Sequence, residues 1–171
     1  MALLPAQPLY TNPSGQGIFW IDGANTAPRP EGRKPSVLVI HDTAGTDSRQ
    51  YLANNDRGVS AHYLVGEYPD CTGPRIYKYA SEAKRITHTQ GPGRLGGIRA
   101  SNINEVAISI EIETPMLSSS SLSYAALLAR EVLRGWQELG VDLIMLPHRI
   151  IQADKYDPRL NWSRWCTMVY S

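Results

Sequence analysis

The chain lacks most of the features that would place it in a specialised class of protein. Its 171 residues include only two cysteines, Cys71 and Cys166. Two cysteines are too few for the disulfide framework of a small secreted domain, and they form no CxxC pattern. We therefore expect both thiols to be unpaired. The formal net charge is only +1, which argues against a nucleic-acid-binding protein because such a protein needs a strongly basic face.

Several sequence signals of location and chemistry are also missing. No hydrophobic run approaches the roughly 18 residues that a membrane span needs. Residues 1–10 have neither the charged start nor the long apolar segment of a secretory signal, so we expect synthesis in the cytoplasm without a signal peptide. The chain has no GxSxG elbow of a serine hydrolase and no HExxH helix of a zinc protease. The glycines of residues 91–97 have no strand-and-helix frame, which excludes a phosphate loop and favours a rim loop over residues 91–104.

The length and composition that remain are those of one soluble domain. A chain of 171 residues can bury a proper core, and 14 Gly and 12 Pro predict many loops. Half of the prolines lie in residues 1–35, which we interpret as an irregular arm packed on a domain of residues 36–171. Residues 17–21 are a short strand candidate within this arm, and we expect Phe19 and Trp20 to pack on the domain.

Apolar runs predict the strands of an α/β sheet, and two of them lead directly to a histidine. Residues 36–40 precede His41, and residues 141–146 precede His148. Because ligands gather at the carboxyl ends of strands in such sheets, both histidines are well placed for a site. A lone histidine after a strand is also often just a satisfied polar residue. Residues 59–65 predict a further strand that contains His62.

Helices are predicted by their caps and by apolar spacing. Ser121 or Ser123 is expected to cap a long helix that ends at Gly140. A short helix follows Asp47 or Ser48, and a closing helix covers residues 161–170. These helices are scaffold for the sheet.

Residues 106–113 alternate like a strand and carry two acids on one face. Glu111 and Glu113 lie on the face opposite Ile108, Ile110 and Ile112. Carboxylates rarely line the interior of a sheet unless they are paired, so this face must be a site or open to water. We expect Glu113, near the strand end, to be solvated, whereas Glu111 calls for a functional explanation.

The segment that follows residues 141–146 holds three groups suited to a hydrolytic metal site. A polar loop that folds back from His148 would bring Asp157 beside it, and the two side chains would supply two ligands. With a third ligand from elsewhere, the fourth zinc position stays open for water. Lys155 lies two residues before Asp157 and, in an extended segment, points to the same side. The spacing alone is no zinc signature.

Five segments in order resemble the zinc-dependent N-acetylmuramoyl-L-alanine amidases of the type-2 amidase and peptidoglycan-recognition-protein superfamily. They span roughly residues 36–165. The resemblance is carried by residues 37–44 (VLVIHDTA), 59–65 (VSAHYLV), 87–91 (THTQG, like the family's WHAG), 104–113 (NEVAISIEIE, like NxxSIGIELE) and 148–158, which end in KYDP like the family's KxDP.

The resemblance implies a metal site and a mechanism. Position by position, His41, His148 and Asp157 would bind one Zn²⁺ per chain. Glu111 would be the catalytic acid that moves the proton, and Lys155 would stabilise the transition state. The fold implied is a single α/β domain with a central mixed β-sheet flanked by α-helices.

Some positions leave alternatives open or depart from the family pattern. His62 is either a substrate-pocket residue or a packed strand histidine, and the same choice applies to His88. Ala61 stands where phage members carry a catalytic tyrosine, which favours the version of the mechanism that uses Glu111. The departures are Thr87 for an aromatic residue, Ser109 for a glycine and Arg159 for a glycine.

The function implied is hydrolysis of the amide bond between N-acetylmuramic acid and L-alanine in peptidoglycan or a muropeptide. We favour a phage endolysin that lyses the host cell wall over a cytoplasmic recycling enzyme. One rival is a non-catalytic peptidoglycan-binding module of the same fold, but the complete set His41, His148, Asp157 and Lys155 argues against it. A second rival is a zinc amidase acting on a different amide. The sequence leaves the oligomeric state open.

Overall fold

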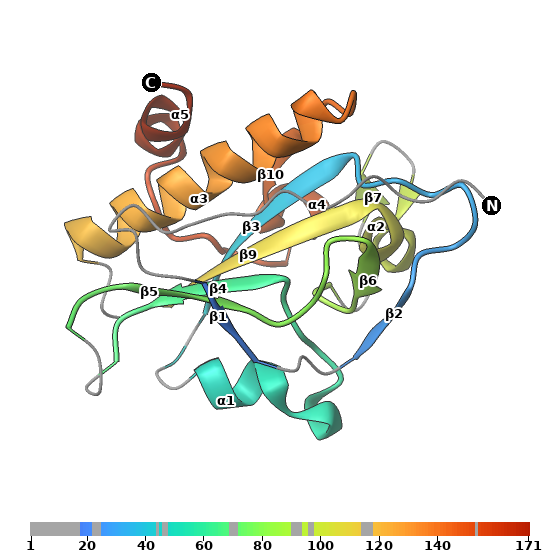
Figure 1. Ribbon diagram of the computed structural model, residues 1–171, viewed down its shortest axis with the longest axis horizontal. Coiled ribbons are helices and arrows are strands. Elements are labelled where there is room, and N and C mark those ends of the chain that lie inside the picture. Colours follow the sequence, from blue (N-terminus) through green and yellow to red (C-terminus); the bar gives the residue numbers. More distant parts are fainter. Residues whose placement is uncertain are drawn as a thin grey trace.

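The computed structural model (Figure 1) describes residues 18–21, 25–43, 45, 48–68, 72–89, 94–95, 98–113, 118–152 and 154–171. The strands are β1 (Phe19–Trp20), β2 (Thr26–Pro28), β3 (Val37–Thr43), β4 (Tyr63–Gly66), β5 (Arg75–Lys78), β6 (Lys84–Ile86), β7 (Arg94–Leu95), β8 (Ile98–Arg99), β9 (Ala107–Glu113) and β10 (Ile144–Pro147). The helices are α1 (Ser48–Ala53), a 3₁₀ turn (Asn55–Arg57), α2 (Ala100–Val106), α3 (Ser119–Glu138), α4 (His148–Ile151) and α5 (Trp162–Tyr170).

A six-stranded mixed sheet in the order β1-β5-β4-β9-β3-β10 forms the centre of the domain. Strands β4, β9, β3 and β10 are parallel to one another, and β5 is antiparallel to β4. The run Val37–Ile40 of β3 lies between β9 and β10 and is buried on both faces, as its continuous apolar pattern predicted. The predicted single α/β domain with a flanked mixed sheet is confirmed.

Helices cover both faces of this sheet (Figure 1). On one face, α3 and α5 pack on the even-numbered residues of β3 and β9. That core consists mainly of Leu38, Ile40, Ile108, Ile110, Ile112, Ala125, Leu128, Val132, Trp136, Trp165 and Val169. On the other face, Ile103 of α2 and Ile151 of α4 pack on Val37 and Val39, while Leu52 of α1 packs near Leu64. The face that carries Glu111 is therefore covered by short helices, which leave room at the strand ends.

The caps explain where the long helix begins and ends. The Ser118 side chain accepts the backbone N–H of Ser121, so the cap of α3 is Ser118 and not Ser121 or Ser123 as expected. Gly140 has φ +75° directly after the helix, which is the left-handed conformation that a helix end favours. The buried stripe of α3 includes Ala125, Leu128, Val132 and Trp136.

Other boundaries differ from the prediction. Strand β3 continues through His41 to Thr43, and β4 begins only at Tyr63, so that His62 precedes it. Residues 100–106 form α2 instead of a rim loop; residues 91–93 and 96–97 of that predicted loop lie outside the described residues. Phe19 and Trp20 are 44% and 56% exposed, because β1 is a two-residue edge strand held by backbone pairing to β5. Phe19 nevertheless packs on the domain as predicted, because its ring lies 5.8 Å from that of Tyr77, centroid to centroid.

The remaining expectations concern termini and thiols. The described part of the N-terminal arm supplies β1 and β2, and β2 pairs with β6; residues 1–17 and 22–24 lie outside the described residues. Cys166 is a free thiol, and Cys71 lies outside the described part of the chain. Among the helices described, none has the length and apolar character to cross a membrane.

Candidate metal centre and active site

The strand register brings three functional side chains together at one end of the sheet. His41 of β3 is the cross-strand partner of Glu111 of β9. Ile40 pairs with Pro147 of β10, so His148, the next residue, arrives beside His41. Three neighbouring parallel strands thus deliver Glu111, His41 and His148 to the same level, where the carboxyl ends of strands form ligand sites.

The chain then turns back through α4 and returns Asp157 to the same place. The Arg149 backbone N–H donates to the carbonyl oxygen of Asp157 at 3.0 Å, and the Arg149 side chain donates to that of Pro158 at 2.7 Å. Ile151 anchors α4 in the core. The Asp157 carboxylate lies 2.9 Å from Nδ1 of His148 and 3.4 Å from Nδ1 of His41.

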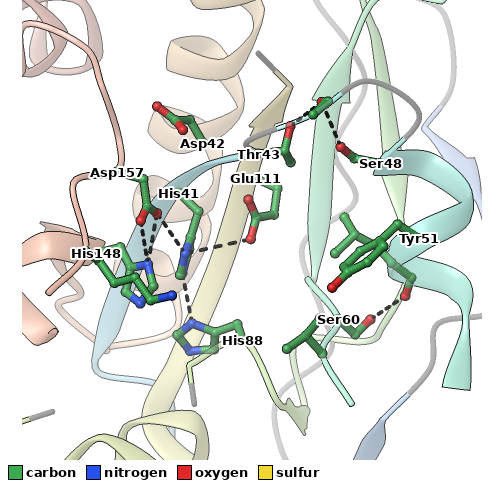
Figure 2. A pocket seen from close by; sticks show the side chains of 14 residues that line it. His41, Asp42, Thr43, Ser48, Tyr51, Ser60, His88, Glu111, His148 and Asp157 are labelled. Carbon is green, nitrogen blue, oxygen red and sulfur yellow. Dashed lines mark hydrogen bonds and ion pairs between the residues drawn. The ribbon is translucent and has the colours of Figure 1, made fainter. Parts of the chain in front are cut away.

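His41, His148 and Asp157 have the geometry of a metal-binding set (Figure 2). One ligand atom from each residue lies within 4.8 Å of the others. Both imidazoles are nearly buried, at 2% and 5% exposure, and both turn Nδ1 toward the carboxylate. Two imidazoles and one carboxylate are a common donor set of catalytic zinc, which keeps its fourth position for water or substrate. The residues present therefore fit a zinc ion.

The pKa values of the two carboxyl groups of the site, Asp157 and Glu111, are shifted in opposite directions. Burial lowers the pKa of His41 to about 4, against the opposing hydrogen bond of Asp157, so its ring is neutral at pH 7, as a ligand must be. Burial alone would raise the pKa of Asp157, but hydrogen bonds from His148 and His41 hold it well below its usual value. Burial, followed by repulsion from Asp157 and Asp42, raises the pKa of Glu111 to about 8. In many active sites one carboxylate stays ionised while a neighbouring carboxyl group holds a proton for acid–base catalysis.

The cluster forms one wall of a cavity of about 550 Å³. Lys155 lines the same cavity and is exposed, as expected from its position two residues before Asp157. The opposite wall comes from α1 and the segment before β4. In Figure 2, Tyr51 and Ser60 lie across this space from His41, His148 and Asp157.

The other two histidines have different environments. His88 lines the cavity, and its Nδ1 lies 3.0 Å from Nε2 of His41. Burial and the neighbouring histidines lower its pKa well below the usual value. His62 is fully buried: its Nδ1 accepts the backbone N–H of Ser109 at 3.1 Å, and its Nε2 lies 3.1 Å from the carbonyl oxygen of Lys84. His62 does not line the cavity, which matches the packed alternative.

Glu113 is not solvated at the strand end, so that prediction is wrong. It is only 6% exposed, and its carboxylate accepts the backbone N–H of Ser48 at 2.8 Å. Because Ser48 begins α1, the second acid of β9 holds the helix that forms the far wall of the cavity.

Two residues of the site, Gln152 and Asp42, were not predicted from the sequence. Gln152, 1% exposed, places its side-chain oxygen 2.7 Å from Nε2 of His148; the spacing of four residues is a helical signal, but a loop was expected there. Asp42, whose side chain is 3% exposed, pairs with the Arg159 guanidinium at 3.1 Å. This ion pair links the end of β3 to the segment of Asp157. Arg159, placed at a family glycine, thus has a structural contact.

A sequence model of the N-acetylmuramoyl-L-alanine amidase family (Amidase_2) matches residues 31–160, a range that contains the whole cluster. The chain belongs to this amidase family. A search of curated proteins gives no match.

Solved amidase structures confirm the fold. The AmpD selenomethionine derivative is 21% identical, with a TM-score of 0.67 over 89% of this chain and 94% of AmpD. AmpDh3 from Pseudomonas aeruginosa is 25% identical, with a TM-score of 0.65 over 81% of this chain and 61% of AmpDh3. AmiD from E. coli, solved with the substrate anhydro-N-acetylmuramic acid-L-Ala-D-gamma-Glu-L-Lys, is 23% identical, with a TM-score of 0.60 over 82% of this chain and 60% of AmiD. This amidase-family chain thus spans about three fifths of AmpDh3 and of AmiD.

Proposed function

We propose that this protein is a zinc-dependent hydrolase that cleaves the amide bond between N-acetylmuramic acid and L-alanine in peptidoglycan. The observation that carries the proposal is the convergence of His41, His148 and Asp157 within 4.8 Å, in a chain whose family is that of N-acetylmuramoyl-L-alanine amidases. Peptidoglycan or a muropeptide is the proposed substrate, because AmiD was solved with a muropeptide as its substrate.

The proposed metal site uses Nδ1 of His41, Nδ1 of His148 and the carboxylate of Asp157, with one zinc per chain. When bound, zinc supplies Lewis acidity, which polarises a carbonyl group and makes water acidic near pH 7. Asp157 contributes the negative charge of the donor set, and the low pKa of this carboxyl keeps it ionised at neutral pH.

Glu111 is the proposed proton carrier. Its Oε1 lies 3.7 Å from Nδ1 of His41, so it sits beside the ligand set without belonging to it. From this position Glu111 takes a proton from the attacking water and returns it to the leaving amine. Such a group is most effective when its pKa lies near the working pH, and burial raises the pKa of Glu111 in that direction.

Lys155 is the proposed electrostatic stabiliser. Its side chain lines the cavity beside Asp157, where an ammonium group can face the negative charge that develops on the carbonyl oxygen. One well-placed donor of this kind contributes roughly 3–4 kcal/mol to the transition state. His88 also lines the cavity, and a contact with substrate stays a prediction for it; we leave His62 out of the site.

Digestion of purified peptidoglycan tests the proposal. Cleavage at the proposed bond releases peptides with a free L-alanine amino terminus, which mass spectrometry after amine labelling identifies. Pre-treatment with a chelator, and the variant Asp157→Ala, should both abolish the release. A different new amino terminus would instead indicate an amidase for another amide. Stable wall binding without any product would indicate a binding module.

The biological setting needs a second substrate. An endolysin, the role we propose, is expected to clear a suspension of intact sacculi. A recycling enzyme is expected to cleave soluble anhydro-muropeptides but to leave intact sacculi turbid. Comparing the two rates with one preparation separates these roles.

A further inference from the structure

The two imidazoles of the proposed metal site are oriented in the same way. Each turns Nδ1 toward the Asp157 carboxylate and Nε2 away from it. Nε2 of His148 lies 2.7 Å from Oε1 of Gln152, and Nε2 of His41 lies 3.0 Å from Nδ1 of His88. Both outward contacts are buried.

This arrangement decides where the imidazole protons must be when a metal is held. A neutral imidazole carries one proton, and a nitrogen that coordinates a metal must present a lone pair. If Nδ1 coordinates, the proton is on Nε2, and that N–H needs an acceptor because it is buried. The amide oxygen of Gln152 accepts from His148. Nδ1 of His88 accepts from His41, so the proton of His88 is on its own Nε2, which is buried and has no hydrogen-bond partner among the described residues.

We propose that His88 and Gln152 are positioning residues that fix the tautomer and ring orientation of His41 and His148 for metal binding. This inference rests on the proposed zinc site. His88 orients His41 in addition to the substrate contact predicted for it, and Gln152 orients His148. Partners of this kind raise the basicity of metal-bound histidines, and their loss typically weakens metal affinity by 10- to 100-fold.

Both positioning residues are themselves held in place. The Asn104 side chain on α2 accepts the backbone N–H groups of His88 and Thr89 at 3.2 Å, and it donates to the Thr89 carbonyl oxygen at 3.0 Å. Gln152 caps α4 with its backbone N–H on the carbonyl oxygen of His148 at 3.0 Å. The acceptors are therefore fixed with respect to the rings that they contact. A residue that orients a metal-coordinating side chain must itself be held in place, and both residues meet this condition.

Zinc affinity measured by competition with a chromophoric chelator tests the inference without relying on turnover. Gln152→Met and His88→Leu remove the acceptors while keeping much of the side-chain volume. We expect each variant to bind zinc 10- to 100-fold more weakly and to change the visible spectrum of the cobalt-substituted protein. His88→Asn and Gln152→Glu keep an acceptor oxygen near the same place and should recover most of the affinity. His62→Asn, at a buried histidine that does not line the cavity, is the matched control and should bind zinc like the parent.

The outcomes separate this inference from the proposed function. A parent protein that binds no zinc contradicts the proposed function itself. A parent that binds zinc tightly, together with leucine and methionine variants that match its affinity and cobalt spectrum, overturns only the positioning role. Equal losses in His88→Asn and His88→Leu also overturn it for His88, because the ring would then act by packing. Far-ultraviolet circular dichroism of each metal-free variant verifies that it is folded.

Discussion

Replacing Glu111 by glutamine is the perturbation that separates proton transfer from metal binding. Glutamine has nearly the same shape as glutamate but cannot accept the proton. Glu111 lies outside the ligand set and its Oε1 is 3.7 Å from Nδ1 of His41, so we expect zinc to remain bound. A positioned acid–base group contributes about 10²- to 10⁴-fold to rate, which corresponds to roughly 3–5 kcal/mol of transition-state stabilisation. The variant should lose turnover by that factor.

The assay is the initial rate of release of peptides with an L-alanine amino terminus, measured together with the zinc content of the same sample. Glu113→Gln is the matched control: it lies on the same face of β9, outside the cavity wall, and an amide oxygen can still accept the Ser48 N–H. The control should keep both zinc and most of the rate. Glu111→Gln with the rate of the parent would refute the role of Glu111. Loss of zinc from that variant would show instead that Glu111 is a ligand.

Two further predictions concern stability. Glu82 is fully buried and accepts hydrogen bonds from the Tyr63 hydroxyl and the Trp136 indole. Glu82→Leu leaves both donors without this acceptor and should lower the unfolding free energy measured in urea by about 2–6 kcal/mol. An equal loss in Glu82→Gln would contradict that explanation. His62 is held neutral because burial, then the charge of Arg29, lowers its pKa to about 3, while the unfolded chain has the ordinary value of about 6.5. The contribution of neutral His62 to the unfolding free energy is complete above about pH 6.5, and it falls toward pH 3 by up to about 1.4 kcal/mol per pH unit. The unfolding free energy of metal-free His62→Asn should therefore fall less between pH 7 and 5 than that of the parent, and equal slopes would contradict this account.

The strands that carry the candidate site were predictable because their signals are local. The buried run before His41 and the alternation around Glu111 each predict a strand from a few neighbouring residues. Parallel pairing then places strand ends together, so Glu111, His41 and His148 could be expected at one edge. Asp157 was expected beside His148 from the polar loop that folds back after the strand, but the spacing is no zinc signature, and the resemblance to the family's closing motif was needed to support it as a ligand.

What the sequence did not reveal depends on contacts between distant segments. The His88 contact to His41 joins residues 47 apart, and the Arg159 contact to Asp42 joins residues 117 apart. No periodicity encodes such pairs. His62 looked like a strand residue because its neighbours are apolar, yet Ser109 and Lys84 bind its ring and hold it in the interior. Glu113 looked solvated because it ends a strand, but the start of α1 covers it.

The central claim, that His41, His148 and Asp157 hold one zinc ion, is tested most directly by anomalous X-ray diffraction at the zinc edge on crystals of the purified protein. We predict a single strong peak among these three side chains, with Nδ1 of each histidine as the coordinating atom. A zinc-loaded crystal with no peak at that position, or with its peak elsewhere on the chain, would contradict the account.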